Sequence, residues 1–395
     1  MIFHALQNIW PDRRMLTPAA LSVFLVEVRD EIHILNDSTK SALLDYLLSR
    51  PLDDDFDHLI GLPLIPTCDG GWNSLEYLSS LKLPIDDLEL VLFGKGCQNT
   101  RTVDTTRLST RAFAKLKVLQ SHGMHGLQSW GIEAVYDFCM GSYFTEVADE
   151  RSSIYVSGLD PFFPDFVESL WRWILLKSTS NDINTLTGLW IIPLVDNHYH
   201  KIAVGISSRV HIPLEPSGAF GGFVLSNKSY FSPFPIIDEQ FNPDASSLLK
   251  SNMMVTDPTN LGQILQWIYC AGESIPKLSP DLKDLLCCHL AEIAACSIYE
   301  EAEARIYTQL IREFELWKEV SNTSTGTITN WIRLTGGIRY VAVANKTLTA
   351  VPETPNVVFL HAESSSNRTL MELFSLAETP DASKYMSLYV IPSLS

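Results

Sequence analysis

The stretch "GLPLIPTCDGGW", residues 61–72, decides the fold. Its Leu and Ile residues favour an extended strand, and Asp69 and Gly70 tolerate the positive φ angles of a tight turn, so that the chain can return as a second strand. Pro63 and Pro66 have no backbone N–H to donate, so the first strand should lie at a sheet edge or be broken. The stretch therefore predicts a β-hairpin.

The same pattern recurs 127 residues later in "LTGLWIIPLVDNHY", residues 186–199. Six positions are the same in both copies: Leu59 and Leu186, Gly61 and Gly188, Leu62 and Leu189, Ile65 and Ile192, Pro66 and Pro193, Asp69 and Asp196. The same shift places the apolar face of the helix predicted over 38–50 on "SLWRWILLKS" at 169–178. A helix, a polar turn and a hairpin thus recur as one unit, which indicates an internal repeat.

A third, weaker copy is predicted over 302–351. There "TGGIRYVAVANKTLTAV" follows a strongly helical segment, and four of its residues match Gly61, Leu62, Ile65 and Asp69 of the first copy. These residues are Gly337, Ile338, Val341 and Asn345.

The expected fold class is therefore α+β, with helix-plus-β-hairpin units in series. We expect the first unit in 1–150, the second in 151–275, and a helical segment with the weak third hairpin in 276–395. Because the Asp-Gly turn recurs as Asp-Asn and Asn-Lys, we interpret the opening stretch as turn chemistry rather than as a ligand-binding or catalytic loop.

Composition limits the partners. The 395 residues are 46% hydrophobic, and 46 acidic side chains against 29 basic ones give a net charge of −17. Nucleic acid and anionic membranes need clustered basic residues, so neither is an expected partner. The most basic stretch, "TRLSTRAFAKLKVLQ" at 106–120, is interpreted as a solvated helix face, with a local basic patch as the alternative.

The sequence also predicts a cytoplasmic location. Seven scattered cysteines do not form a secreted disulfide framework. No basic leader precedes an apolar core at the N-terminus, and no apolar run is long enough to span a membrane.

The repeat resembles a known family. A helix followed by "L-x-G-L-P-L-[LI]-P-x-x-[DN]-G" resembles the repeat unit of sacsin and sacsin-like proteins, and the resemblance covers 38–75 and 165–202, with an echo at 302–351. It implies a protein-interaction or chaperone-associated scaffold that is not itself catalytic.

The resemblance does not extend to the GHKL-type ATPase module of that family. Its nucleotide site needs an Asp-x-Gly-x-Gly loop, whereas "CDGGW" at 68–72 has adjacent glycines and "PSGAFGGF" at 216–223 has no Walker lysine. We therefore expect no nucleotide and no other cofactor.

Two histidine groups leave an enzyme as the alternative, either a hydrolase or a metal-dependent enzyme. Asp196, His198 and His200 alternate along the second hairpin and would share one face of a regular strand, where they could ligate a metal ion. His122 and His125 lie in a Gly-rich loop, but no G-x-S-x-G elbow accompanies them. We interpret both groups as structural or solvated, with these roles as weaker candidates.

A Phe-, Pro- and Gly-rich loop is predicted over 217–244. Five phenylalanines there are candidate protein contacts, namely Phe220, Phe223, Phe231, Phe234 and Phe241. The alternative is that these rings close the core between the second hairpin and the helix that begins near residue 260. The Cys-rich helix "LLCCHLAEIAAC" at 285–296 is expected to be core, with a thiol site as its alternative.

Overall fold

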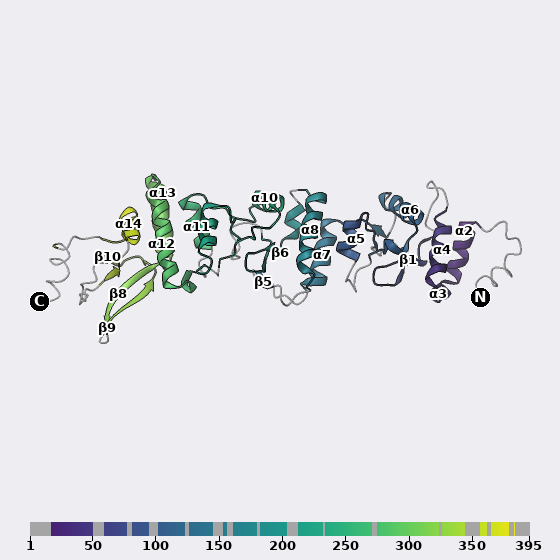
Figure 1. The fold of residues 1–395 in the computed structure, drawn as a ribbon, viewed down its shortest axis with the longest axis horizontal. Helices are drawn as coiled ribbons and strands as arrows, with labels where there is room; N and C mark the ends of the chain where they lie inside the picture. Colours follow the sequence, from purple (N-terminus) through teal and green to yellow (C-terminus); the bar gives the residue numbers. More distant parts are fainter. Residues whose placement is uncertain are drawn as a thin grey trace. The chain divides into compact units, whose positions relative to one another are not determined.

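The computed structural model shows a mixed α+β fold (Figure 1). The structure describes residues 17–49, 59–76, 81–94, 102–122, 126–144, 153–155, 161–179, 182–203, 212–231, 234–270, 275–323, 326–343, 356–361, 365–378 and 383. Two compact units divide the chain, one made of 1–148 and 157–189 and the other of 149–156 and 190–395. The three-segment organisation predicted from the sequence stays a prediction.

The N-terminal helices begin at side-chain caps. Helix α2 (Pro18–Glu27) starts after Thr17, whose hydroxyl accepts from the N–H of Ala20, as expected for an N-cap followed by proline. Helix α3 (Arg29–Ile32) is short. Helix α4 (Asp37–Leu47) is capped by Asn36, whose side-chain oxygen accepts from the N–H of Thr39 at 2.8 Å.

Both predicted hairpins are present. In the first, β1 (Pro63–Pro66) pairs antiparallel with β2 (Trp72–Ser74), and a bulge interrupts β1. In the second, β6 (Trp190–Pro193) pairs with β7 (His198–Lys201), and a bulge interrupts β6 at the corresponding place. Strand β5 (Ser153–Tyr155) adds to the other edge of β7.

The two hairpins have the same register. Adding 127 to the partners Pro63↔Ser74, Ile65↔Asn73 and Pro66↔Trp72 gives the second set, Trp190↔Lys201, Ile192↔His200 and Pro193↔Tyr199. Gly61 and Gly188 both have positive φ before the strand, as do Gly70 and Asn197 in the turn. Sequence and backbone therefore repeat with the same period here.

The likeness continues past the hairpin. In the first unit Asp104 donates its N–H to Pro66 O at 2.9 Å, and in the second Asp238 donates to Pro193 O at 3.0 Å. Each aspartate then accepts from the N–H two residues further on, at 3.0 Å from Thr106 and 2.9 Å from Gln240. A third extended segment thus closes each hairpin in the same way.

Further helices and strands complete the first unit. They are β3 (Leu81–Lys82), α5 (Asp87–Gly94), η3 (Thr105–Arg107), α6 (Thr110–Ser121), β4 (Leu127–Gln128), α7 (Ile132–Tyr143), α8 (Phe163–Lys177) and η5 (Asp182–Leu186). Strands β3 and β4 pair in parallel.

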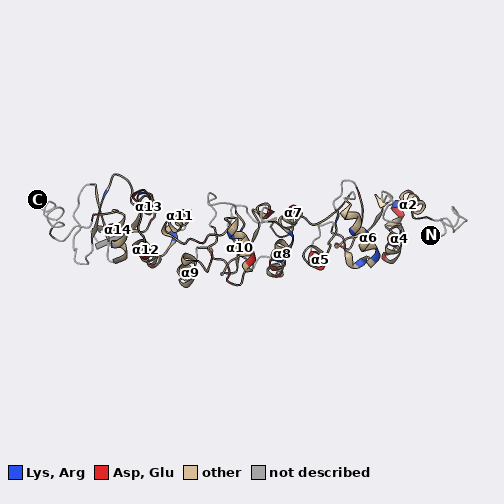
Figure 2. Ribbon diagram, turned by 90° about the horizontal axis from the view of Figure 1, so that it is seen from above, with Lys and Arg blue, Asp and Glu red and all other residues tan. Residues whose placement is uncertain are grey.

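Helix α6 carries the most basic stretch, and Figure 2 shows blue segments on its ribbon. Arg111 donates to the carbonyl of Ser49 at 3.2 Å, and Lys117 donates to that of Ile85 at 3.4 Å. These two side chains are therefore engaged with backbone carbonyls.

The second unit continues with helices and a larger sheet. They are α9 (Ala219–Ser226), α10 (Pro243–Ser251), α11 (Leu261–Cys270), η6 (Ile275–Lys277), α12 (Pro280–Ala295), α13 (Glu301–Glu313), β8 (Trp317–Thr323), β9 (Gly326–Ile332), β10 (Arg339–Val343), β11 (Val357–His361) and α14 (Ser365–Leu373). The sheet has the order β10–β11–β8–β9, in which β10 and β11 are parallel.

The third copy differs from the expectation. Gly337 has a positive φ and β10 begins two residues later, as in the first copy. However, the unpredicted hairpin β8–β9 lies between α13 and β10, and the described strand partner of β10 is the parallel β11. Asn345 lies outside the described residues.

Each unit has its own apolar core. One cluster of buried side chains, from Leu21 to Leu127, joins α2, α4 and the first hairpin. Another, from Leu214 to Leu376, joins α9, α11, α12 and the C-terminal sheet. In the described part of the chain, no helix combines the length and apolar character needed to cross a membrane.

Candidate functional site

The second hairpin does not bring its three candidate ligands together. His198 Nδ1 lies 3.1 Å from Asp196 Oδ2 at a half-exposed turn. His200 is buried, and its Nδ1 lies 2.7 Å from the carbonyl oxygen of Lys201. Among the described residues, no three His, Cys, Asp or Glu side chains form a group that could hold a metal ion.

The other histidine group is only partly described. His122 is exposed at the C-terminal cap of α6, where its N–H donates to Val118 O at 3.1 Å. His125 lies outside the described residues. The position of His122 is therefore that of a helix cap.

The Phe-rich segment forms part of a core, which corrects its prediction as an irregular contact loop. Helix α9 lies within it, and Phe220, Phe231 and Phe234 are at most 5% exposed. Phe223 is half-buried against the same core, and Phe241 is also half-buried. Because three of the five rings pack inside the molecule, they are not available as surface anchors.

The Cys-rich segment is core on one face only, because Cys287 is buried while Cys288 is half-buried and Cys296 is exposed. Cys287 on α12 is fully buried, and burial raises the pKa of its thiol well above the ordinary value. The neighbouring His289 stacks on Phe223 with ring centroids 3.9 Å apart. Burial lowers the pKa of His289, while Glu292 acts in the opposite direction.

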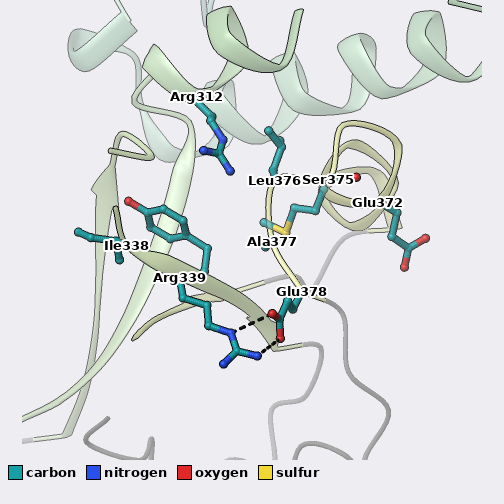
Figure 3. Close-up of a pocket in the computed structure, with 10 residues that line it drawn as sticks. Arg312, Ile338, Arg339, Glu372, Ser375, Leu376, Ala377 and Glu378 are labelled. Atoms are coloured by element: carbon teal, nitrogen blue, oxygen red, sulfur yellow. Dashed lines mark hydrogen bonds and ion pairs between the residues drawn. The ribbon is translucent and has the colours of Figure 1, made fainter. Parts of the chain in front are cut away.

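A pocket of about 470 Å³ lies beside the C-terminal sheet (Figure 3). Arg312 reaches it from the last turn of α13, while β10 and the segment that begins in α14 provide the other walls. Its lining residues are Arg312, Ile338, Arg339, Tyr340, Met371, Glu372, Ser375, Leu376, Ala377 and Glu378. We call it the Arg312 pocket.

Backbone hydrogen bonds at the end of α14 shape one wall. Ser375 adopts a left-handed conformation with φ of 48°. Its N–H donates to Glu372 O at 3.3 Å, and the N–H of Leu376 donates to Met371 O at 2.9 Å. These two bonds form a Schellman motif, which places Leu376 next to Met371 in the apolar part of the wall.

The chain after this motif is fixed to β10. The N–H of Glu378 donates to Tyr340 O at 2.8 Å, and the N–H of Ala342 donates to Glu378 O at 2.7 Å. The Tyr340 hydroxyl accepts from the N–H of Thr335 at 2.8 Å, which holds its ring in place. The pocket is therefore built on hydrogen-bonded backbone.

The charges around the pocket are unevenly paired. Arg339 donates two hydrogen bonds of 2.8 Å to Glu378, and Arg368 donates one of 3.1 Å to Glu372. Within the described part of the chain, Arg312 Nε is buried and has no hydrogen-bond acceptor. In Figure 3 Arg312 lies on the side of the pocket opposite the Arg339–Glu378 pair.

An unsatisfied buried donor carries a penalty. Leaving such a group without a partner costs about 1–3 kcal/mol, and more when it is charged. An arginine stays protonated at neutral pH, so Arg312 can hold an anion but is a poor proton donor or acceptor. Arg312 therefore gives the pocket a group that can bind an anion rather than one that transfers protons.

The sequence alone does not reveal this site. Arg312 stands in "LIREFE" within a charged helix, where nothing in the sequence distinguishes it from Arg305, two turns earlier on the same helix. Its one signal is an arginine in the last turn of a helix, next to the buried Ile311. Only the packing of β10 and α14 beside it reveals the pocket.

The chain matches no known protein in the three comparisons made. No protein-family model matches it, and neither a curated protein nor a solved structure shows significant similarity.

Proposed function

We propose that this chain is a non-catalytic scaffold that binds other proteins, of the sacsin-like, chaperone-associated type. The observation that supports it is the common register of the two hairpins, each with its bulge, its Asp turn and its positive-φ residues in equivalent places. Repeat proteins use such a common frame to present different side chains from successive units.

The two hairpins present different side chains at equivalent positions. Strand β2 shows Trp72, Asn73 and Ser74 half-exposed, whereas the equivalent His200 of β7 is buried. Trp72 lies under the guanidinium of Arg107, 4.6 Å from the ring centre, and its Nε1 donates to Asp37 at 2.8 Å. The same frame therefore carries different chemistry in its two copies.

We propose a scaffold rather than a hydrolase or metal-dependent enzyme because the described candidates do not converge: His122 is exposed at a helix end, and Asp196, His198 and His200 form no group of three that could hold a metal ion. The proposed partners are proteins, not nucleic acid, membrane or nucleotide, because a net charge of −17 opposes extended contact with anionic surfaces. The proposed location is the cytoplasm.

Affinity capture of the whole chain, followed by titration of each captured polypeptide against the purified protein, tests this function. We expect saturable binding with fixed stoichiometry that survives a metal chelator and needs no nucleotide. Chemical conversion of a captured polypeptide would contradict the proposal. So would a reproducible, dose-dependent rise in melting temperature with ATP and Mg²⁺, because a specific ligand stabilises the folded state by linkage.

A further inference from the structure

We propose that the Arg312 pocket binds a monocarboxylate that carries an apolar substituent. This inference concerns a site for a small ligand or a chain end in the second unit. It rests on different observations from the scaffold function and does not depend on it.

The carboxylate is inferred from the guanidinium group of Arg312. Both acidic residues of the pocket already have an arginine partner, Glu378 through Arg339 and Glu372 through Arg368. Among the described residues, Arg312 has no such partner, and its buried Nε lacks an acceptor. A planar carboxylate matches the fork of N–H donors on a guanidinium group and would balance its charge.

A single negative charge is inferred from the balance of charges. Two arginines, Arg312 and Arg339, and two glutamates, Glu372 and Glu378, line the pocket. Each carboxylate is paired with an arginine, Glu378 with Arg339 and Glu372 with Arg368. The unpaired charge is therefore the one on Arg312. A phosphate dianion would bring a second charge near the carboxylates of Glu372 and Glu378, where like charges repel.

The apolar substituent is inferred from the walls. Met371 and Leu376 are buried and line the pocket next to Ala377, and Ile338 lies at its opening with 38% of its surface exposed. Pockets for small ligands usually measure about 300–1,000 Å³ and combine apolar walls with a few polar groups. The 470 Å³ of this pocket lie in that range.

This chemistry has two possible sources, the C-terminus of a polypeptide that ends in an apolar residue and a free organic acid. An N-acetylated tetrapeptide that ends in leucine represents the first, and octanoate represents the second. The tetrapeptide amide, which has the same side chains without the charge, is the control for the carboxylate.

Titration calorimetry of these probes against the full chain tests the proposal. We expect at least one acid to bind in a saturable way, and inorganic phosphate and the amide to bind at least about tenfold more weakly, which corresponds to about 1.4 kcal/mol. If the peptide acid binds and octanoate does not, the source is a chain end, and the reverse result indicates a free acid. Absence of saturable binding by both acids would overturn the proposal.

Two variants of α13 form a matched pair. Arg312→Gln removes the guanidinium from the pocket, and we expect affinity for the acid to fall at least about tenfold. Arg305→Gln makes the same change on the same helix at an exposed ion pair with Glu301, and we expect affinity to stay within about twofold. Equal losses in both variants would overturn the proposal.

Arg312→Lys keeps the charge but loses the planar fork, so an intermediate affinity is expected. The melting temperature of each variant without ligand shows whether it is folded. If Arg312→Gln does not fold, the affinities of Arg312→Lys and Arg305→Gln for the acid are compared instead. If Arg312→Lys binds the acid as tightly as the wild type does, and phosphate binds as tightly as the acid, the assignment of a carboxylate is overturned.

Discussion

Asp69 and Asp196 make the same hydrogen bond in two hairpins that lie 127 residues apart. Asp69 Oδ1 accepts from the N–H of Gly71 at 3.0 Å, and Asp196 Oδ1 accepts from the N–H of His198 at 3.3 Å. Asp69 Oδ1 also accepts from the Thr67 hydroxyl at 2.6 Å. The second partner therefore differs between the turns: it is the Thr67 hydroxyl in the first, whereas in the second His198 Nδ1 lies 3.1 Å from Asp196 Oδ2.

We expect Asp69→Ala to lower the free energy of unfolding by about 1 kcal/mol, the usual contribution of such hydrogen bonds. Asp196→Ala is expected to cost less, because the hydrogen bond of Asp196 to the backbone is longer and its contact with the His198 side chain lies at an exposed turn, where such pairs contribute little. Urea denaturation of the two variants measures both losses in the free energy of unfolding. A larger loss for Asp196→Ala would contradict the ranking.

The contribution of Asp69 to the stability of the folded state should depend on pH. The Thr67 hydroxyl and the Gly71 N–H lower the pKa of Asp69 in the folded state. Its stabilisation is therefore complete above the unfolded pKa of about 3.9 and is lost as the pH falls through the lower folded value. The difference in stability between the wild type and Asp69→Ala should shrink below about pH 4, and a constant difference down to pH 2 would argue against this.

Adjacent glycines in α9 should respond in opposite ways to alanine. A Cβ on Gly221 would lie 1.8 Å from the carbonyl oxygen of Glu215, whereas a Cβ on Gly222 would lie 3.5 Å from its nearest neighbour, Pro216 O. We expect Gly221→Ala to destabilise the second unit by about 2 kcal/mol through this overlap. Gly222→Ala should be neutral or stabilise it by up to about 1 kcal/mol through helix propensity. Thermal denaturation checks the pair, and equal effects would refute the close approach.

Glu89 is a buried carboxylate that joins three groups. It accepts from Trp173 Nε1 at 3.1 Å and from the N–H of Ile85 at 2.8 Å, and it lies 3.6 Å from Lys177 Nζ. Glu89→Ala leaves these donors without their acceptor, so we expect a loss of about 3 kcal/mol in the free energy of unfolding.

The neighbouring Asp87 is exposed on the same helix and is the control. Asp87→Ala should change the free energy of unfolding by no more than about 0.5 kcal/mol. Urea denaturation of the two variants measures both changes in the free energy of unfolding. Losses of similar size in the two variants would show that the buried network contributes little.

His289 should make the second unit sensitive to acid. Burial against Phe223 lowers its pKa, so the unfolded chain takes up a proton more readily than the folded one. The stability that His289 contributes is complete above the unfolded pKa of about 6.5 and is lost as the pH falls toward the lower folded value. Replacing His289 with Phe should reduce the decline in melting temperature between about pH 7 and 5, and an unchanged decline would contradict this origin.

Local chemistry made the hairpins predictable. Gly and Asp favour the backbone angles of the turns, and Pro lacks the N–H that a strand needs for pairing. These effects act over a few residues, so the repeated sequence predicted the strands, the turns and an interrupted first strand. The helix caps at Thr17 and Ser279 are local in the same sense. By contrast, the β8–β9 hairpin was not predicted, because its strands are polar and the sequence between them has no characteristic turn pattern.

The sequence by itself determined the α+β class and the two hairpins, because these depend on contacts between near neighbours. Only the tertiary structure decided which side chains are buried. It placed Phe220 and Phe231 in the core, where helix α9 packs with Gly221 against the backbone of Glu215. Among the residues that the structure describes, it also left Arg312 without an acid partner beside β10 and α14, since a pocket arises from segments that meet in space and not in sequence.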